Sequence, residues 1–334
     1  MDLSIVFVNY KTEALLLECL RSIYTHTNGL NFECIIVDNH FIPGQNQAIL
    51  DEFPTTNWID SGGNIGFSKA NNIGLQAAKG QYILFLNADT LLVDNSIYLA
   101  YEHLKKDTSL AAVGGIQLDE NRQAIPYYRT LNDVRRDFYI VPNKPFLHAL
   151  IDRLLPKQTF SRPEETNNVV GAFLMASREN LLKIKGWDED FFMYAEDAEL
   201  SFRLSKLGNL AYFDDVKFIH LIQENPFRRT NFSWVNRFAM QIQVSNLLWV
   251  RKSYGVLAVL IIYANYTLLA PLFWLWKIGI NLIKGENWLN DTNNQRIFSQ
   301  KLRVLYHYFF AILFLKKGPY RIKPEENIDQ VNKS

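Results

Sequence analysis

Short apolar runs alternate with helical patterns along residues 4–116. Runs that are rich in β-branched residues and too short for a helix predict buried strands, whereas apolar residues three and four positions apart predict helices. The predicted strands are Ser4–Val8, Cys34–Val37, Asn57–Ile59, Tyr82–Leu86 and Ala111–Ile116. The predicted helices are a segment from Thr12 to near Asn28-Gly29, then Gln47–Glu52, Phe67–Lys79 and Ser96–Lys105. Repeated βα units predict an α/β fold, with a mostly parallel sheet covered by helices on both faces.

Polar residues stand just after four of these strands. Asn9 and Asp38 follow the first two strands, Asp60 follows the third, and Asn87-Ala88-Asp89 follows the fourth. In open α/β sheets, ligands bind at the carboxyl ends of the strands. The sequence therefore predicts a binding site at this edge of the sheet.

The pattern is weaker between residues 121 and 166, which hold several prolines and many basic residues. We interpret this stretch as a variable insertion that lies over the site or on an acceptor surface, and an ordinary solvated insertion is the open alternative. Its basic residues include Arg129, Arg135, Arg136, Arg153 and Arg162. The pattern then predicts strands at Val169–Ala176, Ala211–Phe213 and Val216–His220, and helices at Arg178–Lys183 and Glu196–Leu207.

Composition narrows the class of protein. The chain has 334 residues, 48% of them hydrophobic, which is enough for a sizeable core. The 35 Lys and Arg nearly cancel the 34 Asp and Glu, so the charge gives no argument for a nucleic-acid partner. Cys19 and Cys34 lie in apolar segments, as expected for buried thiols in a reducing compartment. The first apolar run is too short for a secretory signal, so we expect the N-terminal part in the cytosol.

Carboxylates gather in two places. Asp89 ends an otherwise apolar strand, where it is either a turn residue or a ligand for a hard cation that prefers oxygen. Residues 186–200 hold six carboxylates among aromatic side chains. Glu196 and Asp197 fall at the start of a predicted helix, whose dipole favours anions, and a carboxylate there can act as general base on a hydroxyl. His220 would be a packing residue by itself, but beside a cation site it is a competent ligand.

Glycines between a strand and a helix can hold phosphate, and Ser61-Gly62-Gly63-Asn64-Ile65-Gly66 has this placement. The GxGxxG spacing is absent, and the first βα turn, Asn9-Tyr10-Lys11-Thr12, has no glycine. The sequence therefore does not support a dinucleotide-binding site.

The ordered set of segments resembles the family 2 inverting glycosyltransferases, which have the Rossmann-like GT-A fold. Within them it is most similar to the bacterial rhamnosyltransferase-like branch that builds surface polysaccharides. The matching segments are Ser4-Ile5-Val6-Phe7-Val8-Asn9-Tyr10, Ile35-Ile36-Val37-Asp38-Asn39, Gly63-Asn64-Ile65-Gly66-Phe67 with Asn72-Ile73-Gly74 and Asn87-Ala88-Asp89, and Gly171-Ala172-Phe173-Leu174-Met175 with Gly186-Trp187-Asp188-Glu189 and Glu196-Asp197. The likeness predicts a GT-A domain over residues 1–225, and the apolar runs of the C-terminal third predict a helical, membrane-associating region over residues 226–334.

The resemblance implies a role for each candidate residue. Asp38 would bind the uracil or thymine ring, and Asp197 would be the catalytic base. Asp89 and His220 would hold Mg²⁺ or Mn²⁺. The nucleotide-sugar pocket would consist of Asn9, Asp38, Asn64, Lys69, Asn87 and Asp89, and the acceptor side would include Trp187, Glu196 and Arg203.

The chain departs from the family pattern in two places. Asn87 replaces the first Asp of the DxD motif, so metal dependence is expected to be weaker than in strict DxD enzymes. His40-Phe41-Ile42-Pro43-Gly44 stands where the family usually has a Ser and an Asp-Gly turn, which changes the loop after Asp38.

The C-terminal third carries a long apolar run. Val256–Trp276 has no charged residue, is interrupted by Asn265 and Pro271, and is about as long as a membrane span needs. A second run, Val304–Leu315, is too short to span and ends in Lys316-Lys317. Three alternatives remain: a spanning helix, helices lying in the cytosolic leaflet, and buried soluble helices. The second is favoured, because Pro271 suggests a bent arrangement.

From the resemblance we expect a sugar to pass from a nucleotide diphosphate donor, with dTDP-L-rhamnose as the candidate, to a hydroxyl of a saccharide on a polyprenyl lipid. We expect this transfer at the cytoplasmic face of the bacterial inner membrane, with the enzyme held there as a peripheral or monotopic protein. A sugar-phosphate nucleotidyltransferase is one alternative, although the first strand lacks the glycine-rich, basic signature that it needs. A non-catalytic, membrane-bound subunit of a polysaccharide assembly complex is the other.

Overall fold

The computed structural model describes residues 1–125, 145–154, 159–221 and 237–319. These residues fall into two compact units, a sheet unit and a helical unit that contains α6, α9 and α10. The strands are β1 Leu3–Asn9, β2 Phe32–Asp38, β3 Asn57–Asp60, β4 Tyr82–Leu86, β5 Thr90–Leu91, β6 Leu110–Leu118, β7 Glu165–Thr166, β8 Phe173–Ser177 and β9 Asn209–His220. The helices are α1 Glu13–His26, α2 Gln47–Glu52, α3 Phe67–Ala77, α4 Ser96–Lys106, α6 Pro145–Leu154, α7 Arg178–Lys183, α8 Glu196–Leu204, α9 Arg237–Ile283 and α10 Asn293–Leu313.

The sheet of the described residues has nine strands, and their directions determine which strand ends lie at the same edge. The order is β3-β2-β1-β4-β8-β6-β9-β5, and β7 pairs with β9. The strands β1, β2, β3 and β4 are parallel, as are β6 and β9, whereas β8 runs antiparallel to both of its neighbours. Phe173 at the start of β8 consequently pairs with Leu86 at the end of β4. The start of β8 and the carboxyl ends of β1, β2, β4, β6 and β9 therefore share one edge.

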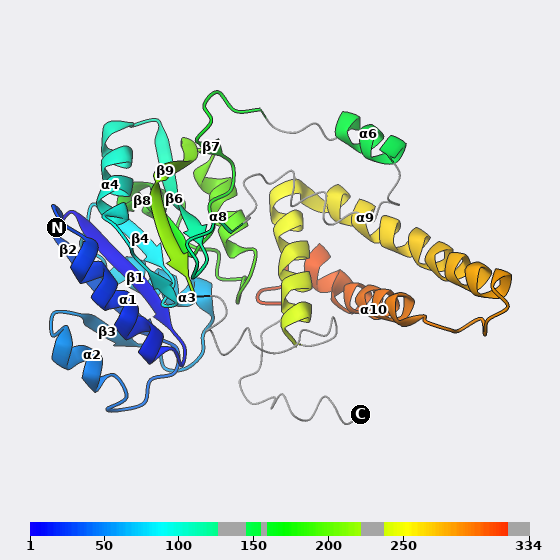
Figure 1. Ribbon diagram of the computed structural model, residues 1–334, viewed down its shortest axis with the longest axis horizontal. Helices are drawn as coiled ribbons and strands as arrows, with labels where there is room; N and C mark the ends of the chain where they lie inside the picture. Colours follow the sequence, from blue (N-terminus) through cyan, green and yellow to red (C-terminus); the bar gives the residue numbers. More distant parts are fainter. Residues whose placement is uncertain (126–144, 155–158, 222–236, 320–334) are drawn as a thin grey trace. The chain divides into compact units, whose positions relative to one another are not determined.

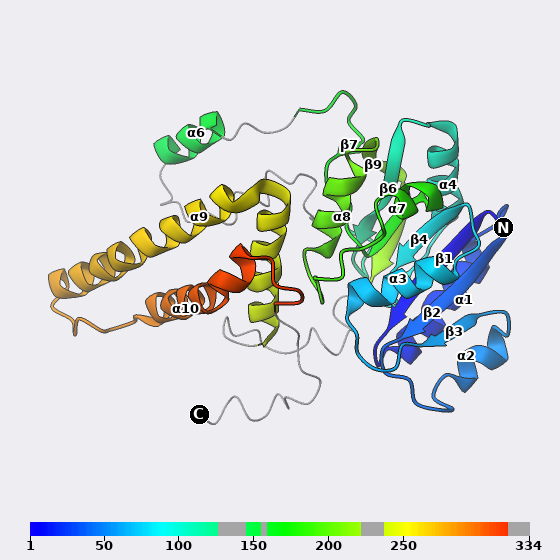
Figure 2. The same cartoon turned by 180° about the vertical axis from the view of Figure 1, so that it is seen from behind.

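Apolar side chains alternate between the two faces of the strands. In β1, Leu3, Ile5 and Phe7 join one core cluster and Val6 joins the other. The first cluster is completed by α1 and α4, and the second by residues of α3, α7 and α8. Figure 1 shows α1 on the near side of the sheet, and Figure 2, from behind, shows α3 and α7. This confirms the predicted α/β sheet with helices on both faces.

One prediction about β9 was wrong. Two strands were expected, but Asn209–His220 is a single strand whose register against β6 shifts between Gly114 and Ile116. The exposed Asp214 and Asp215 interrupt the apolar pattern at that irregularity, so one irregular strand looks like two in the sequence. The two-residue strands β5 and β7 were not predicted, since they are too short to show a period.

Parts of the predicted insertion and of the domain boundary lie outside the described residues. Residues 126–144 and 155–158 of the insertion are among them, including Arg129, Arg135 and Arg136. The boundary at 225–226 falls there too. Of the described residues in the insertion, α6 belongs to the helical unit and β7 to the sheet unit.

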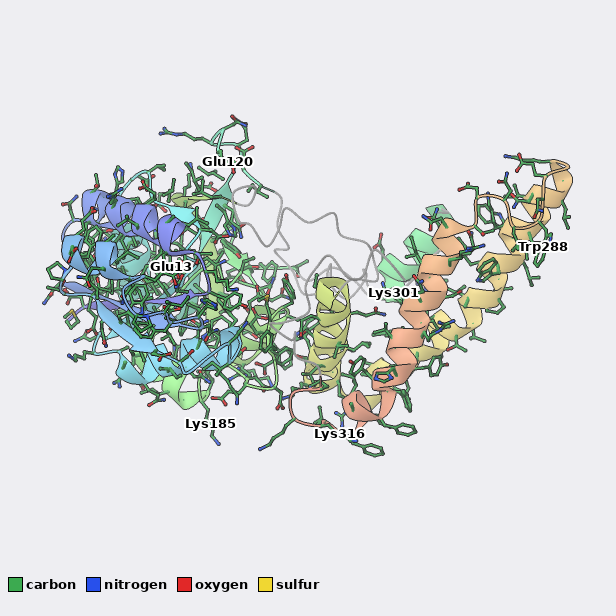
Figure 3. The ribbon with its side chains drawn as sticks, turned by 90° about the horizontal axis from the view of Figure 1, so that it is seen from below. Glu13, Glu120, Lys185, Trp288, Lys301 and Lys316 are labelled. Carbon is green, nitrogen blue, oxygen red and sulfur yellow. The ribbon has the colours of Figure 1, made fainter. Side chains whose placement is uncertain are left out.

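The helical unit is built on an antiparallel hairpin of α9 and α10. Helix α9 is broken at Gly255, where φ is +86°, whereas Pro271 lies inside the helix. The Tyr263 hydroxyl donates to the Leu305 carbonyl oxygen at 2.6 Å, and the Trp274 Nε1 donates to the Ser299 Oγ at 2.9 Å. Figure 3 shows Trp288 at the tip of the hairpin and Lys316 at the other end of α10.

Much of the apolar surface of this hairpin is exposed. Among the described residues one helix, Gln241–Ile283, is long and apolar enough to cross a membrane, and only 28% of its most apolar stretch is buried. Its outward-facing leucines include Leu257, Leu268, Leu272, Leu275 and Leu282, all more than half exposed, and α10 adds Phe310. Such a surface is typical of contact with a partner or a membrane.

The close packing of α3 on β1 gives a test of the fold. A Cβ at Gly74 would lie 2.3 Å from the Val6 Cγ1 inside the core, so Gly74→Ala should destabilise α3 by about 1–3 kcal/mol, despite the higher helix propensity of alanine. Gly279→Ala is the matched control, because a Cβ there meets nothing within 4 Å. Local opening free energies from amide hydrogen exchange check this. Equal protection of α3 in the Gly74 variant and the wild type would contradict the packing.

Candidate active site

The parallel strands bring the predicted polar residues to one edge of the sheet. Asn9 and Asp38 end β1 and β2 and are paired in register, and Asn87 follows β4. His220 ends β9 on the other side of β8 and β6. The edge thus gathers residues that lie more than 200 positions apart in the sequence, as the pattern predicted.

Asn9 and Asp38 form a buried polar pair. The Asn9 Nδ2 donates to the Asp38 Oδ1 at 3.1 Å and to the Glu13 Oε1 at 3.0 Å, while the Thr12 hydroxyl donates to the Asn9 Oδ1 at 2.9 Å. The backbone N–H of His40 also donates to the Asp38 Oδ1, at 2.9 Å. Burial raises the pKa of Asp38, and these hydrogen bonds oppose the rise. The loop after Asp38 is therefore anchored on the carboxylate itself.

The glycine-rich loop 61–66 lies between β3 and α3 and needs its glycines. Gly62, Gly63 and Gly66 all have positive φ, and a Cβ at Gly66 would lie 2.8 Å from the Phe192 carbonyl oxygen. The Asn64 Oδ1 accepts the Gly66 N–H at 3.2 Å, so this side chain holds the turn. Lys69 lies in α3 with its Nζ 3.9 Å from the Glu189 Oε2, beside a surface cavity that both residues line. Nucleotide contacts by Asn64 and Lys69 stay predictions.

Asp89 and His220 are brought together by the short strand β5. Thr90 pairs with His220 across β5 and β9, which places the Asp89 Oδ1 3.2 Å from the His220 Nε2. Both residues are buried, with 4% and 3% of their surface exposed. The other ring nitrogen, Nδ1, lies 3.1 Å from the Oε1 of Gln117 in β6. Gln117 was missed from the sequence, although it is a polar residue at the end of an apolar strand, like the residues that were singled out.

This pair fits a divalent cation as a partial ligand set. Among residues 1–125, 145–154, 159–221 and 237–319, no group of three or more His, Cys, Asp or Glu side chains could hold a metal ion. Mg²⁺ and similar ions are, however, commonly bound by only one or two carboxylates together with substrate phosphates and water. One carboxylate and one imidazole nitrogen 3.2 Å apart are compatible with that arrangement.

Asp197 is held by strained backbone and by two N–H groups. Tyr194 and Ala195, just before α8, have φ of +69° and +61°, which is uncommon for residues other than glycine and costs about 1–3 kcal/mol each. The Asp197 Oδ1 accepts the Ala198 N–H at 2.8 Å, and the Oδ2 accepts the Gly171 N–H at 3.2 Å. Burial raises the pKa of Asp197, which makes its carboxylate a stronger base.

A two-residue backbone segment connects the two acidic regions. Gly171 donates its N–H to Asp197, and the next residue, Ala172, accepts the N–H of Asn87 at 3.1 Å. The segment enters β8, whose reversed direction brings it to the functional edge. The Asn87-Ala88-Asp89 turn and the first turn of α8 are therefore positioned by the same short piece of backbone.

Glu196 is a buried acid beside Asp197. Only 8% of its surface is exposed, and within the described part of the chain its Oε2 has no hydrogen-bond partner. Burial, and then the charge of Asp197, raises the pKa of Glu196 to about 8. Burial therefore favours the protonated form of this acid, which is able to donate a hydrogen bond.

Trp187 and Arg203 serve the packing of the loop that precedes α8. Trp187 is 1% exposed and packs edge-on against Phe67 and Phe85. Arg203 donates to the Glu199 carboxylate at 2.7 Å and to the carbonyl oxygens of Ile184 and Gly186 at 2.6 and 2.7 Å. These contacts give both side chains a structural role, and a direct contact with an acceptor stays a prediction.

The sequence is similar to those of known glycosyltransferases. The model of the family described as "Glycosyl transferase family 2" matches residues 4–181. The chain is 26% identical over 273 residues to the low-salt glycan biosynthesis hexosyltransferase Agl10 of Haloferax volcanii, covering 78% of this chain and 82% of that protein. It is 23% identical over 200 residues to the N-acetylglucosaminyl-diphospho-decaprenol L-rhamnosyltransferase of Mycobacterium tuberculosis, covering 54% of this chain and 62% of that protein.

A solved structure shares the fold. The mannosyltransferase PcManGT from Pyrobaculum calidifontis, solved with GDP-Man and Mn²⁺, superposes with a TM-score of 0.53 at 15% identity, over 94% of this chain and 88% of that one. The likeness confirms the GT-A fold expected from the sequence. The family match ends before Asp197 and His220, so the interpretation of these two residues rests on the geometry above.

The buried acid of α8 predicts how stability depends on pH. The pKa of Glu196 is raised from 4.5 to about 8 in the folded state, so the native protein binds more protons than the unfolded chain between these values. Stability should therefore fall as the pH rises through this window. Glu196→Gln should remove most of this fall and make the protein more stable than wild type above pH 8.

Urea unfolding midpoints between pH 4.5 and 8.5 measure this effect. Glu120→Gln is the matched control, because Glu120 is exposed after β6 and should leave the pH profile unchanged (Figure 3). A Glu196→Gln profile that parallels the wild type would show that this carboxyl is not desolvated.

Proposed function

The chain belongs to glycosyl transferase family 2, and from this membership we propose that it transfers a sugar from a nucleotide diphosphate donor to an acceptor hydroxyl with inversion of the anomeric centre. The observation that carries the proposal is the Gly171-Ala172 segment, which hydrogen-bonds to Asp197 on one side and to the Asn87-Ala88-Asp89 turn on the other. A base and a diphosphate site must be close for a direct displacement.

The donor would lie along the edge from β2 to β9. Asp38, held by Asn9 and the His40 N–H, has the hydrogen-bonding capacity to receive the N–H of a uracil or thymine ring. Asn64, Lys69 and Asn87 would complete the nucleotide-sugar pocket. Asp89 and His220 would hold Mg²⁺ or Mn²⁺, and such a cation neutralises the charge that develops on a departing diphosphate.

Asp197 would act as the base. Its carboxylate takes the proton of the acceptor hydroxyl while the hydroxyl oxygen forms a bond to the anomeric carbon. The bond from that carbon to the diphosphate breaks on the opposite face, and the diphosphate leaves with the electron pair. The raised pKa of Asp197 supports this role, because general bases are most effective when their pKa lies near the working pH. Protonated Glu196 would hydrogen-bond the acceptor without repelling the base.

The relatives suggest the substrates. The Mycobacterium tuberculosis relative is named for L-rhamnosyl transfer to a diphospho-decaprenol acceptor. We accordingly infer dTDP-L-rhamnose as the first donor to test, and a saccharide on a polyprenyl lipid as the acceptor in cell-surface polysaccharide synthesis. Slow donor hydrolysis, measured for several nucleotide sugars with and without Mn²⁺ or Mg²⁺, identifies the donor and tests the cation requirement. Metal-dependent hydrolysis also separates an enzyme from a non-catalytic subunit.

The helical unit supports a membrane location. The exposed leucines of α9 and the exposed aromatic residues of α10 form an apolar surface, with Lys316 at one end of the hairpin and Trp288 at the other (Figure 3). Lys317 follows Lys316 in the sequence. Trp and Lys are residues that anchor helices at the interface of a bilayer. We infer that the hairpin lies in the cytoplasmic leaflet of the bacterial inner membrane as a peripheral or monotopic anchor, where it would meet a lipid-linked acceptor.

Replacing the proposed base should lower the rate of sugar transfer without lowering the affinity for the donor. Asp197→Asn should lower sugar transfer by about 10²- to 10⁴-fold and leave donor affinity nearly unchanged, because a general base contributes mainly to the transition state. Transfer rates and donor titration calorimetry measure the two effects. Asp214→Asn, an exposed acid in β9, is the control. Full transfer activity in the Asp197 variant would exclude this residue as the base.

Membrane attachment can be tested on the exposed leucines. Leu268, Leu272 and Leu275 are 68%, 58% and 63% exposed, and replacing all three by Gln should weaken binding to phospholipid vesicles by at least about 100-fold, since each leucine contributes on the order of 1–2 kcal/mol when it leaves water. The matched control replaces Tyr24, Ile42 and Leu182, exposed apolar residues of the sheet unit, by Gln. Vesicle flotation measures binding. An equal loss in both triple variants would refute the hairpin as the anchor.

A further inference from the structure

Gln117 is a buried residue of the site to which the proposed reaction gives no role. It lies near the end of β6, next to β9 in the sheet, and is 6% exposed. Its Oε1 is 3.1 Å from the His220 Nδ1, while the His220 Nε2 points to the Asp89 Oδ1 at 3.2 Å. The imidazole is thus held between an amide on one side and the proposed cation position on the other.

The alternation of β9 explains why these groups meet. Val216 and Phe218 point into the core cluster that α1 and α4 cover, and His220, two residues on, continues that face. Phe218 also pairs with Gln117 in the β6–β9 register. The histidine therefore has one ring edge toward β6 and the other toward the Asp89 turn.

We propose that Gln117 is a positioning residue that fixes His220 as a nitrogen ligand for the cation. A neutral imidazole that offers the Nε2 lone pair to a cation must carry its proton on Nδ1, and a buried N–H needs an acceptor. The Gln117 Oε1 is at hydrogen-bond distance from that nitrogen. Hydrogen bonds of this kind orient histidine ligands, and losing one typically weakens metal binding by about 10- to 100-fold.

The inference rests on the proposed cation site at Asp89 and His220, and it adds that the Gln117 Oε1 accepts a hydrogen bond from the His220 Nδ1. The carboxamide must act as an acceptor through Oε1 and not as a donor through Nε2. If the Gln117 Nε2 donated to Nδ1 instead, the imidazole proton would sit on Nε2 and block the cation. Replacing Gln117 by Glu can distinguish the two arrangements, because an ionised carboxylate can only accept a hydrogen bond.

Mn²⁺ binding to the full chain, read by electron paramagnetic resonance of the free ion, tests the inference without any turnover. Gln117→Leu should weaken Mn²⁺ binding by about 10- to 100-fold, whereas Gln117→Glu, which keeps an acceptor, should bind close to wild type. Gln81→Leu is the matched control, because Gln81 is exposed at the start of β4 and should bind as wild type. Thermal unfolding of each variant checks that the fold is retained.

The outcomes are distinguishable. Wild-type binding by Gln117→Leu, or a loss in Gln117→Glu as large as in Gln117→Leu, would overturn the role of Gln117 as acceptor. His220→Ala tests the underlying cation site: if that variant binds Mn²⁺ as well as wild type, the proposed site itself fails. In turnover, Gln117→Leu should need more Mn²⁺ for half-maximal activity and should recover kcat when the ion saturates.

Discussion

The hydrogen bonds of Gly171 and Ala172 are the constraint on which the site depends. They exist because β8 runs against its neighbours, so that its first residues arrive at the edge where the parallel strands end. From there one N–H reaches Asp197 and one carbonyl oxygen reaches the Asn87 N–H. Two regions more than 100 residues apart in sequence are thereby connected, one through backbone atoms alone and the other through the Asp197 carboxylate.

The acids at the start of α8 are held in a conformation and an environment that destabilise the native state. Glu196 and Asp197 are adjacent, both are desolvated, and two left-handed residues precede them. None of these features stabilises the fold, since burial of two adjacent acids and a positive φ both raise the free energy of the native state. The surrounding packing compensates for them. Arg203 ties the helix to the Ile184 and Gly186 carbonyl oxygens, and Trp187 fills the core behind the loop.

Much of the sheet unit could be predicted from sequence, because its strands are continuous apolar runs and its polar residues stand where those runs stop. Asn9, Asp38, Asn87 and His220 were located in this way. The contacts that complete the site could not be, since they depend on pairings between distant segments. The strand β5 is two residues long and forms only against β9. Gln117 follows an apolar run as other site residues do, but only the pairing of β6 with β9 shows that it meets His220. The Glu199–Arg203 pair has the i,i+4 spacing of a helix, whereas the contacts of Arg203 with the Ile184 and Gly186 carbonyl oxygens and the packing of Trp187 depend on the folded loop.

The asparagine at position 87 affects how the proposed cation and the nucleotide donor would bind, because it leaves one carboxylate in this turn instead of two. With Asp89 and His220 as the residues that would hold the cation, the diphosphate and water would supply its other ligands. Ion and nucleotide would then each bind more tightly in the presence of the other. Intracellular free Mg²⁺ would set the working concentration of donor, and release of the nucleotide product would carry the ion away with it. The cation would then bind and leave together with the nucleotide, and the rate of sugar transfer would depend on the concentration of free Mg²⁺ in the cell.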